Sequence, residues 1–280
     1  MPRFHVNGVN LNVEISGKGS PLVLLHGFTG SITNWKSHIP IFEKRFQSIA
    51  VDLLGHGSSD SPADPMRYRM ERCVGDLISI FEQLGLEQVS LLGYSMGGRV
   101  ALQMAAAHPD RVRALVLESA SPGLAGLAER QARVTSDEAL VDSIERDGLE
   151  AFVNRWEQSP LFVSQTRLPA SVRAELRAQR LQNNPRGLAN SLRGLGTGAQ
   201  SSLWDRLREI RVPTLLVAGM LDQKFTVIAR AMAGALPVVR LARVPDAGHT
   251  VHLEQREVFD KLVMEFLEIG DWKPSPISNL

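Results

Sequence analysis

The stretch Val89-Ser90-Leu91-Leu92-Gly93-Tyr94-Ser95-Met96-Gly97 decides the fold, because in it an apolar run ends in a serine between two glycines. Residues 97–108 continue it and are rich in Ala, Leu and Met. A G-x-S-x-G sequence between a strand and a helix is typical of a nucleophile elbow, whose glycines allow the tight turn that exposes the serine hydroxyl. Free amides and the helix dipole at such a turn favour developing negative charge. We therefore predict that Ser95 is a catalytic residue.

Comparable apolar runs recur along the chain, at residues 21–25, 48–51, 114–117 and 214–218. Unalternating runs of Leu and β-branched residues are typical of parallel strands that are covered on both faces. Stretches with apolar residues at helical spacing lie between or after these runs, at 69–84, 97–108 and 258–267. This alternation indicates an α/β protein with a mostly parallel, doubly wound sheet.

Two weaker strand candidates lie at the margins of this pattern. Residues 4–13 contain two short strand-like segments around Asn7-Gly8, a dipeptide typical of hairpin turns, so we expect an antiparallel pair at one edge of the sheet. Arginines interrupt the apolar character of residues 238–244. We expect these residues to form a less buried strand near an edge.

Strand-like runs disappear between residues 121 and 202, where the sequence becomes helical, Arg-rich and punctuated by proline. The segment lies between two core strands, so we predict a helical cap inserted over the carboxyl edge of the sheet, where such sheets bind ligands. With the elbow, this organisation indicates an α/β-hydrolase fold. The expected core comprises residues 1–120 and 203–270, the cap 121–202, and a loose tail 271–280.

A catalytic serine needs a base, and His249 is the best candidate among the seven histidines. It follows the strand-like region 238–244, and Gly248 directly before it lets the loop present the ring. His252 is the local rival. We expect surface positions for three other histidines, His5, His38 and His108.

The acid that orients the histidine falls between the serine and the histidine in the chain order of this fold. Asp222 lies just beyond the strand-like run 214–218 and is our prediction. Glu118 ends the preceding core strand and is the alternative, since some hydrolases place their acid there. Asp246 is too close to His249 in sequence to face its ring.

The loop His26-Gly27-Phe28-Thr29 follows the first core strand and is expected to supply one amide of an oxyanion hole. We predict that the backbone N–H of Phe28 serves there, together with that of Met96, directly after the serine. His26 itself is expected to be a structural hydrogen-bonding residue.

Composition narrows the classes of function. The formal net charge of +1 gives no reason to expect nucleic acid or an anionic membrane as a partner. The start lacks the apolar stretch of a signal peptide, and no apolar run approaches the roughly 18 residues of a membrane span. The single cysteine, Cys73, permits no internal disulfide. We expect a cytoplasmic protein with a buried, inert Cys73, no metal cluster and no cofactor.

Beyond the fold, the chain resembles the family of 2-succinyl-6-hydroxy-2,4-cyclohexadiene-1-carboxylate synthases of menaquinone biosynthesis. The resemblance runs from about Pro21 to Leu267 and lies in Arg99 after the elbow, in Asp222-Gln223-Lys224-Phe225, and in strings of the predicted cap. These strings are Ser121 to Leu124, Arg130 to Arg133 with Asp137, Trp156 to Phe162, Arg180 to Asn184, and Leu188 to Arg193. One departure is Leu221, where the family more often has a charged or polar residue.

The resemblance implies a lyase that removes pyruvate from 2-succinyl-5-enolpyruvyl-6-hydroxy-3-cyclohexene-1-carboxylate, a small-molecule polycarboxylate. Ser95, activated by His249 and Asp222, would abstract a ring proton, and the enolpyruvyl group would then leave. The triad would act as a base, without water or an acyl-enzyme.

The resemblance also implies substrate-binding residues. Arg99, Arg133 and Arg180 match the arginines that bind substrate in the family, and Trp156 matches an aromatic wall residue. A planar guanidinium binds a carboxylate through two hydrogen bonds, which suits a polycarboxylate. Tyr94 is expected to line the same pocket.

Two other functions stay open on the sequence. A carboxylesterase or a carbon–carbon bond hydrolase would use the same triad on an acidic substrate. A non-catalytic ligand receptor on this fold could retain the triad unused. Haloalkane dehalogenases and epoxide hydrolases are disfavoured, because they carry an aspartate at the elbow position that Ser95 occupies here.

Overall fold

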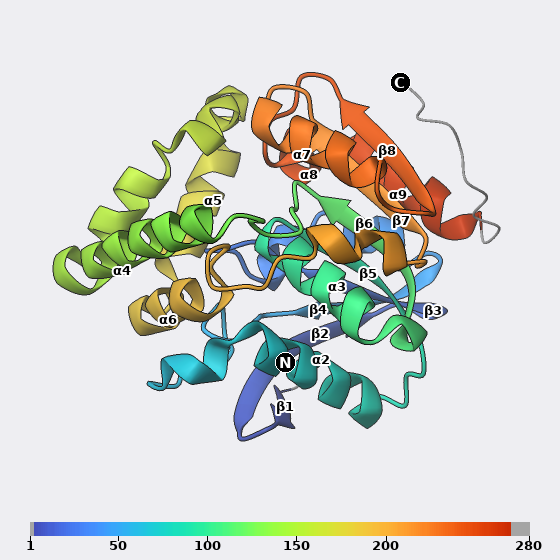
Figure 1. Cartoon of the computed structure of the whole chain (residues 1–280), viewed down its shortest axis with the longest axis horizontal. Helices are drawn as coiled ribbons and strands as arrows, with labels where there is room; N and C mark the ends of the chain where they lie inside the picture. Colours follow the sequence, from blue (N-terminus) through green and yellow to red (C-terminus); the bar gives the residue numbers. More distant parts are fainter. Residues whose placement is uncertain (1–2, 270–280) are drawn as a thin grey trace.

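The computed structural model describes residues 3–269 of the 280-residue chain, so the predicted tail 271–280 lies outside the described residues. Eight strands form one sheet: β1 (Arg3–Val6), β2 (Val9–Ser16), β3 (Ser20–Leu25), β4 (Phe46–Val51), β5 (Val89–Tyr94), β6 (Val112–Glu118), β7 (Thr214–Gly219) and β8 (Val239–Val244). Their order is β1-β2-β4-β3-β5-β6-β7-β8, and the six strands from β3 to β8 are parallel (Figure 1). β5, which carries the elbow, therefore lies inside the sheet.

Helices cover both faces of this sheet. They are α1 (Ile39–Phe42), α2 (Met70–Gln83), α3 (Met96–Ala107), α7 (Gln223–Ala233), α8 (Val251–Glu254) and α9 (Arg256–Glu268). Within residues 3–269, none of the helices combines the length and the apolar character that crossing a membrane requires.

The unbroken apolar character of β3 follows from its position between two cores. Leu22 and Leu24 face the core that includes α1 and α9, whereas Val23 and Leu25 face the core that includes α2, α3 and α7. All four side chains are fully buried. Since successive side chains of a strand point to opposite faces, only a strand covered on both sides needs apolar residues at every position.

Four helical segments between β6 and β7 form what we call the insertion: α4 (Leu127–Trp156), the 3-10 helix η4 (Pro160–Arg167), α5 (Ala170–Leu181) and α6 (Pro185–Leu195). They lie together on the left of Figure 1. The insertion has a small apolar core of its own, to which α4 and α6 contribute. Gly148 breaks α4, because its φ of 83° and ψ of 169° are not helical. A positive φ of this size favours glycine.

Three local predictions are confirmed. β1 and β2 form an antiparallel hairpin, and Asn7 and Gly8 have the positive φ values, 46° and 83°, of its turn. β8 lies at the opposite edge of the sheet. Cys73 is buried in α2, and desolvation raises the pKa of its thiol well above the ordinary value. The thiol is therefore protonated and unreactive at neutral pH.

The expectation of a surface position for His38 is wrong, whereas His5 and His108 are exposed. The His38 side chain is fully buried, and its Nδ1 lies 2.5 Å from Oδ1 of Asp260 in α9. The two residues are 222 positions apart in the chain. No local pattern around His38 indicates so distant a partner.

Candidate active site

Ser95 occupies a strained turn between β5 and α3. Its φ of 50° and ψ of −105° lie in a region that residues other than glycine rarely adopt. A Cβ at Gly93 would lie 2.4 Å from the carbonyl oxygen of Gly97, and a Cβ at Gly97 would lie 2.3 Å from that of Leu25. Both glycines are therefore required by the close approach of the backbone. Such strain is typical of functional turns, and here it presents the Ser95 hydroxyl beyond the sheet edge.

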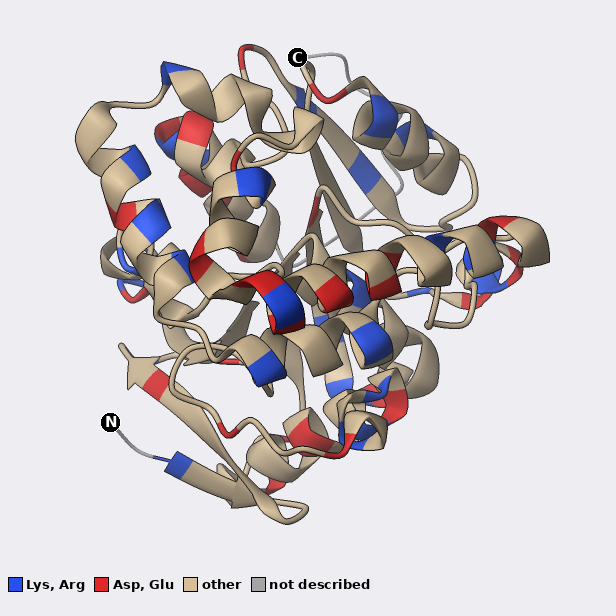
Figure 2. Cartoon of the chain, turned by 90° about the vertical axis from the view of Figure 1, so that its left-hand side faces the viewer, with Lys and Arg blue, Asp and Glu red and all other residues tan. Residues whose placement is uncertain are grey.

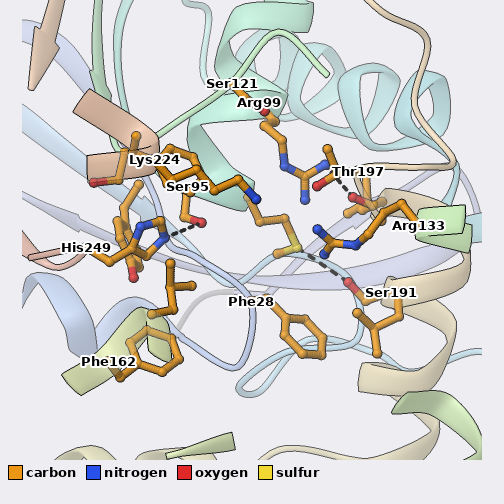
Figure 3. A pocket seen from close by; sticks show the side chains of 18 of the residues that line it. Phe28, Ser95, Arg99, Ser121, Arg133, Phe162, Ser191, Thr197, Lys224 and His249 are labelled. Atoms are coloured by element: carbon orange, nitrogen blue, oxygen red, sulfur yellow. Dashed lines mark hydrogen bonds between the residues drawn. The ribbon is translucent and has the colours of Figure 1, made fainter. Parts of the chain in front are cut away.

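The three residues predicted as a triad lie in one hydrogen-bonded row. Ser95 Oγ lies 3.1 Å from His249 Nε2 (Figure 3). On the other side of the ring, His249 Nδ1 lies 2.7 Å from Asp222 Oδ2. Because the carboxylate accepts from Nδ1, the neutral ring carries its proton there, and Nε2 accepts from the Ser95 hydroxyl. His249 is buried, with the rings of Tyr94 and Phe225 against it. This geometry suits Ser95 for proton abstraction or nucleophilic attack.

Asp222 is held in place from two sides. It is the N-cap of α7, where its Oδ1 accepts the backbone N–H of Phe225 at 3.1 Å while Oδ2 faces His249. The backbone N–H of Leu221 donates to the carbonyl of Ala247 at 2.9 Å, which ties the acid loop to the histidine loop. The Leu221 side chain is 45% exposed, so the departure from the family pattern there leaves these contacts intact.

Glu254 holds the histidine loop, although no sequence motif marked it. Its Oε2 accepts the backbone N–H of Gly248 at 2.8 Å. Its Oε1 accepts from the backbone N–H of Thr250 at 3.2 Å and from the Thr250 hydroxyl at 2.7 Å. One carboxylate thus binds the residues on both sides of His249 and fixes the position of the ring.

The alternative acid and the alternative histidine form a separate pair. Glu118 and His252 are both fully buried, and His252 Nδ1 lies 2.9 Å from Glu118 Oε2. The Tyr94 ring contacts both histidines, with centroid distances of 5.5 Å to His249 and 4.8 Å to His252. His252 therefore has a carboxylate partner of its own. It lies on the other side of the Tyr94 ring from His249, the base next to Ser95.

Ser95 faces a pocket between the sheet edge and the insertion (Figure 3). The pocket encloses about 790 Å³ when the open space at its mouth is included. Residues that follow β3, β5, β6 and β7 meet residues of the insertion there, so the insertion covers the carboxyl edge of the sheet. Most of the predicted site residues line it: Phe28, Tyr94, Ser95, Met96, Arg99, Arg133, Trp156 and His249.

Three cationic side chains converge on one part of this pocket: Arg99 from α3, Arg133 from α4 and Lys224 from α7 (Figure 3). We call these residues the cation cluster. Arg133 has a carboxylate partner, Asp137, one helical turn further along, with 2.8 Å between Nε and Oδ1. Of the described residues that line the pocket, none is Asp or Glu. The cluster therefore has more positive charge than its surroundings balance.

Arg99 shows the effect of this imbalance. Desolvation, and then the charge of Arg133, lowers the pKa of Arg99 to about 10. The guanidinium stays charged at neutral pH, and its Nη1 donates to two neutral oxygens, the Leu195 carbonyl at 2.6 Å and Gln200 Oε1 at 2.5 Å. The charge of Asp137 offsets only part of this shift, so an anionic ligand would further stabilise the partly buried cation.

Arg180 lies apart from the cation cluster, in a smaller neighbouring cavity. Its Nη1 lies 3.0 Å from Glu157 Oε1, and its Nη2 donates to Gln165 Oε1 at 3.3 Å. The guanidinium also lies 5.3 Å from the centroid of the Phe162 ring. The structure thus gives Arg180 partners within the insertion and does not bring it together with Arg99 and Arg133.

The predicted oxyanion residues, Phe28 and Met96, both line the pocket beside Ser95. Met96 is the first residue of α3, and the first amides of a helix have no partner within it. This is the place where an oxyanion hole is expected beside a nucleophile elbow. The structural role predicted for His26 is confirmed, because its Nε2 accepts the backbone N–H of Leu53 at 3.0 Å.

The outer surface of the insertion differs from the pocket, because it carries charges of both signs (Figure 2). Three of its arginines have two or more carboxylate contacts or a close carboxylate partner: Arg155 pairs with Asp147, Arg177 with Glu150 and Glu157, and Arg193 with Glu138 and Glu145. In the described part of the chain, no ion pair involves Arg99 or Lys224. Over the same residues, no three His, Cys, Asp or Glu side chains gather as ligands for a metal ion.

Comparison with known proteins shows similarity over most of the chain. Residues 20–255 match the family model described as alpha/beta hydrolase fold. A Bacillus subtilis (strain 168) protein, provisionally named 2-succinyl-6-hydroxy-2,4-cyclohexadiene-1-carboxylate synthase, is 52% identical over 263 residues, which are 93% of this chain and 96% of that protein. A Serratia proteamaculans (strain 568) protein with the same synthase name is 30% identical over 88% of this chain and 92% of its own length. The solved structure of MenH from S. aureus matches with a TM-score of 0.89 at 37% identity, covering 93% of this chain and 98% of that one.

Proposed function

Because the chain belongs to the 2-succinyl-6-hydroxy-2,4-cyclohexadiene-1-carboxylate synthase family within the α/β-hydrolase fold, we propose that it is a lyase of menaquinone biosynthesis. The proposed reaction eliminates pyruvate from 2-succinyl-5-enolpyruvyl-6-hydroxy-3-cyclohexene-1-carboxylate. In this proposal the enzyme works in the cytoplasm on a small molecule and uses no cofactor.

The observation that carries this proposal is that the cation cluster and the hydrogen-bonded Ser95 share one pocket. The substrate has three carboxylates, on the ring, at the end of the succinyl chain and on the enolpyruvyl group. If the substrate were a neutral ester, nothing would explain why three cations converge in a pocket whose described lining contains no carboxylate. Arg99 and Arg133 are the proposed carboxylate ligands, since a guanidinium binds a carboxylate through two hydrogen bonds.

The proposed chemistry begins with removal of a ring proton beside the succinyl ketone. Asp222 orients His249, His249 accepts the hydroxyl proton of Ser95, and the serine oxygen takes the ring proton. The electron pair of the broken C–H bond forms a new double bond, the ring double bond shifts, and the C–O bond to the enolpyruvyl oxygen breaks. The departing oxygen takes the electron pair, and the imidazolium returns a proton to the pyruvate enolate. Backbone amides at Phe28 and Met96 would stabilise negative charge on the ketone oxygen.

The remaining predicted residues fit this proposal unequally. Trp156 stacks on Phe152 with 5.7 Å between centroids and lies edge-on to Phe28 at 5.5 Å, which makes a rigid apolar wall for the cyclohexene ring. Tyr94 lies between the triad and the buried pair behind it and lines the same pocket. Arg180 is the weakest of the proposed substrate ligands, because its guanidinium already pairs with Glu157.

The test is pyruvate release from the enolpyruvyl substrate, generated in situ by the preceding pathway enzyme and compared with the uncatalysed rate. Pyruvate release that is well above the uncatalysed rate and depends on Ser95 would support the lyase. Release no faster than the background, by a protein that unfolds cooperatively like an intact enzyme, would reject it.

Hydrolysis of an acidic ester or of a carbon–carbon bond is the second candidate. The observation in its favour is the strained elbow of Ser95 at the start of α3, which also suits an acyl-enzyme and its tetrahedral intermediate. The turnover of esters with and without a carboxylate, compared with pyruvate release, distinguishes a hydrolase from the lyase. Ester turnover that exceeds pyruvate release would move the assignment to a hydrolase.

A further inference from the structure

Lys224 is the member of the cation cluster that has no role in the proposal so far. It is the second residue of α7, two positions after Asp222, and it lines the pocket. Its Nζ lies 5.9 Å from the centroid of the Phe225 ring. Figure 3 shows its ammonium group pointing into the space between Ser95 and Arg99.

The helix does not explain a lysine at this position. The N-terminal turn of a helix carries partial positive charge, so a cation there is unfavourable, and the N-cap carboxylate of Asp222, two positions earlier, already binds the Phe225 N–H and His249. Among residues 3–269, no ion pair involves Lys224. Within this range the ammonium group has the Phe225 ring near it but no ion-pair partner, so its charge is available to a ligand.

The three cations come from different walls and differ in exposure. Arg99 and Arg133 are partly buried, and their guanidinium groups face one another, whereas Lys224 is exposed at the mouth on the opposite side (Figure 3). An ammonium binds a carboxylate as a point charge on a flexible stem, without the fixed fork of a guanidinium. Such a residue suits a group that must leave the pocket during each turnover.

We propose, on the basis of the proposed function, that Lys224 binds the carboxylate of the enolpyruvyl group and stabilises it as it departs. When the C–O bond breaks, the electron pair passes to the enol oxygen, and the leaving group becomes a dianion of carboxylate and enolate until it gains a proton. Lys224 neutralises part of this charge next to Ser95. The other two carboxylates stay on the ring product and are left to Arg99 and Arg133.

The assignment can be tested because the ring product lacks the enolpyruvyl carboxylate that Lys224 is proposed to bind. We compare Lys224→Met, which keeps the length of the side chain, with wild type in two assays: kcat/KM for the enolpyruvyl substrate, and competitive inhibition by the dicarboxylate product. One lost charge-assisted contact should lower kcat/KM about tenfold or more. The inhibition constant of the product should stay within about twofold of the wild-type value.

Two further variants control the comparison. Lys224→Arg should recover most of the lost kcat/KM, because it restores the positive charge. Lys44→Met removes a charge from an exposed residue outside the pocket and should change neither constant. Unchanged kcat/KM in Lys224→Met would overturn the assignment, and so would an equal loss of product binding, which would place Lys224 on a retained carboxylate. Failure of the wild-type enzyme to release pyruvate would instead reject the proposed function itself.

Discussion

The carboxylate of Glu118 accepts hydrogen bonds from both the ring and the backbone of His252. His252 Nδ1 lies 3.0 and 2.9 Å from the two carboxylate oxygens, and the His252 backbone N–H lies 3.0 Å from Oε1. The backbone carbonyl of Glu118 in turn accepts the N–H of Ser95 at 2.8 Å. The pair thus ties the elbow to the segment that follows His249, although it lies outside the hydrogen-bonded row of the triad.

Replacing His252 should affect stability more than chemistry. His252→Ala removes the ring partner of the buried Glu118 carboxylate and leaves it only the backbone N–H, and breaking such a buried pair typically costs about 3–5 kcal/mol of unfolding free energy. Urea denaturation measures this loss. His252→Gln retains a donor, and it should fold and release pyruvate within a few-fold of the wild-type rate. Loss of turnover in folded His252→Gln, together with activity in His249→Ala, would show that His252 is the base.

Ser95→Ala and His249→Ala should be about equally severe, because members of a triad act as a unit. Each should lower kcat for pyruvate release by roughly 10³-fold or more, with the melting temperature close to that of wild type. The double variant should be little worse than either single one. Losses that multiply in the double variant would mean that the two residues work in separate steps.

Arg133→Ala should discriminate between substrates. The guanidinium borders the pocket and is paired with Asp137, which holds it toward the cavity. We expect KM for the enolpyruvyl substrate to rise roughly tenfold, the size of one charge-assisted contact, and KM for a neutral ester to stay within about twofold. Arg173→Ala, at an exposed position of α5, is the matched control. Equal effects on both substrates would make Arg133 a surface residue of the insertion.

Stability should fall as the pH falls below about 6.5. Burial, and then the charge of His26, lowers the pKa of His56 to about 3, whereas an unfolded histidine titrates near 6.5. Between these values the unfolded chain binds a proton that the folded protein excludes, so stability present above pH 6.5 is lost toward pH 3. One such histidine gives a slope of up to about 1.4 kcal/mol per pH unit. Burial also lowers the pKa values of His26 and His38, which steepens the slope.

His56→Phe tests the source of this slope. Phe keeps the aromatic contacts with His26 and Phe28 but cannot take a proton. Unfolding free energies from urea denaturation at pH 7.5, 6.5 and 5.5 should depend less on pH in the variant. An identical pH dependence in both proteins would mean that His56 is protonated in the folded state.

The predictable parts of this molecule depend on neighbours in the chain. The elbow at Ser95 needs glycines at fixed offsets, and each parallel strand needs an unbroken apolar run, so both leave local patterns. His249 and Asp222 could be chosen because the fold fixes the order in which the acid and the base follow the serine. Their contacts in the structure, 3.1 and 2.7 Å, agree with that choice.

The parts that escaped prediction depend on partners far away in the chain. The burial of His38 follows from Asp260, and the position of Arg180 follows from Glu157 and Gln165 on neighbouring segments of the insertion. Lys224 belongs to a quoted motif, yet a lysine at the start of a helix resembles any solvated residue until the pocket around it is known. Pairing between side chains of different helices or strands leaves no periodic pattern in the sequence.

The break of α4 at Gly148 separates two kinds of molecular recognition along one helix. Arg133 precedes the break and Trp156 follows it. The charged contact of Arg133 and the aromatic wall of Trp156 therefore belong to two helical segments whose axes are set separately. Substitutions can therefore change the charged contact and the aromatic wall independently. Substitutions after Gly148 would alter which ring shapes the enzyme admits, while those before it would retune its preference for acids.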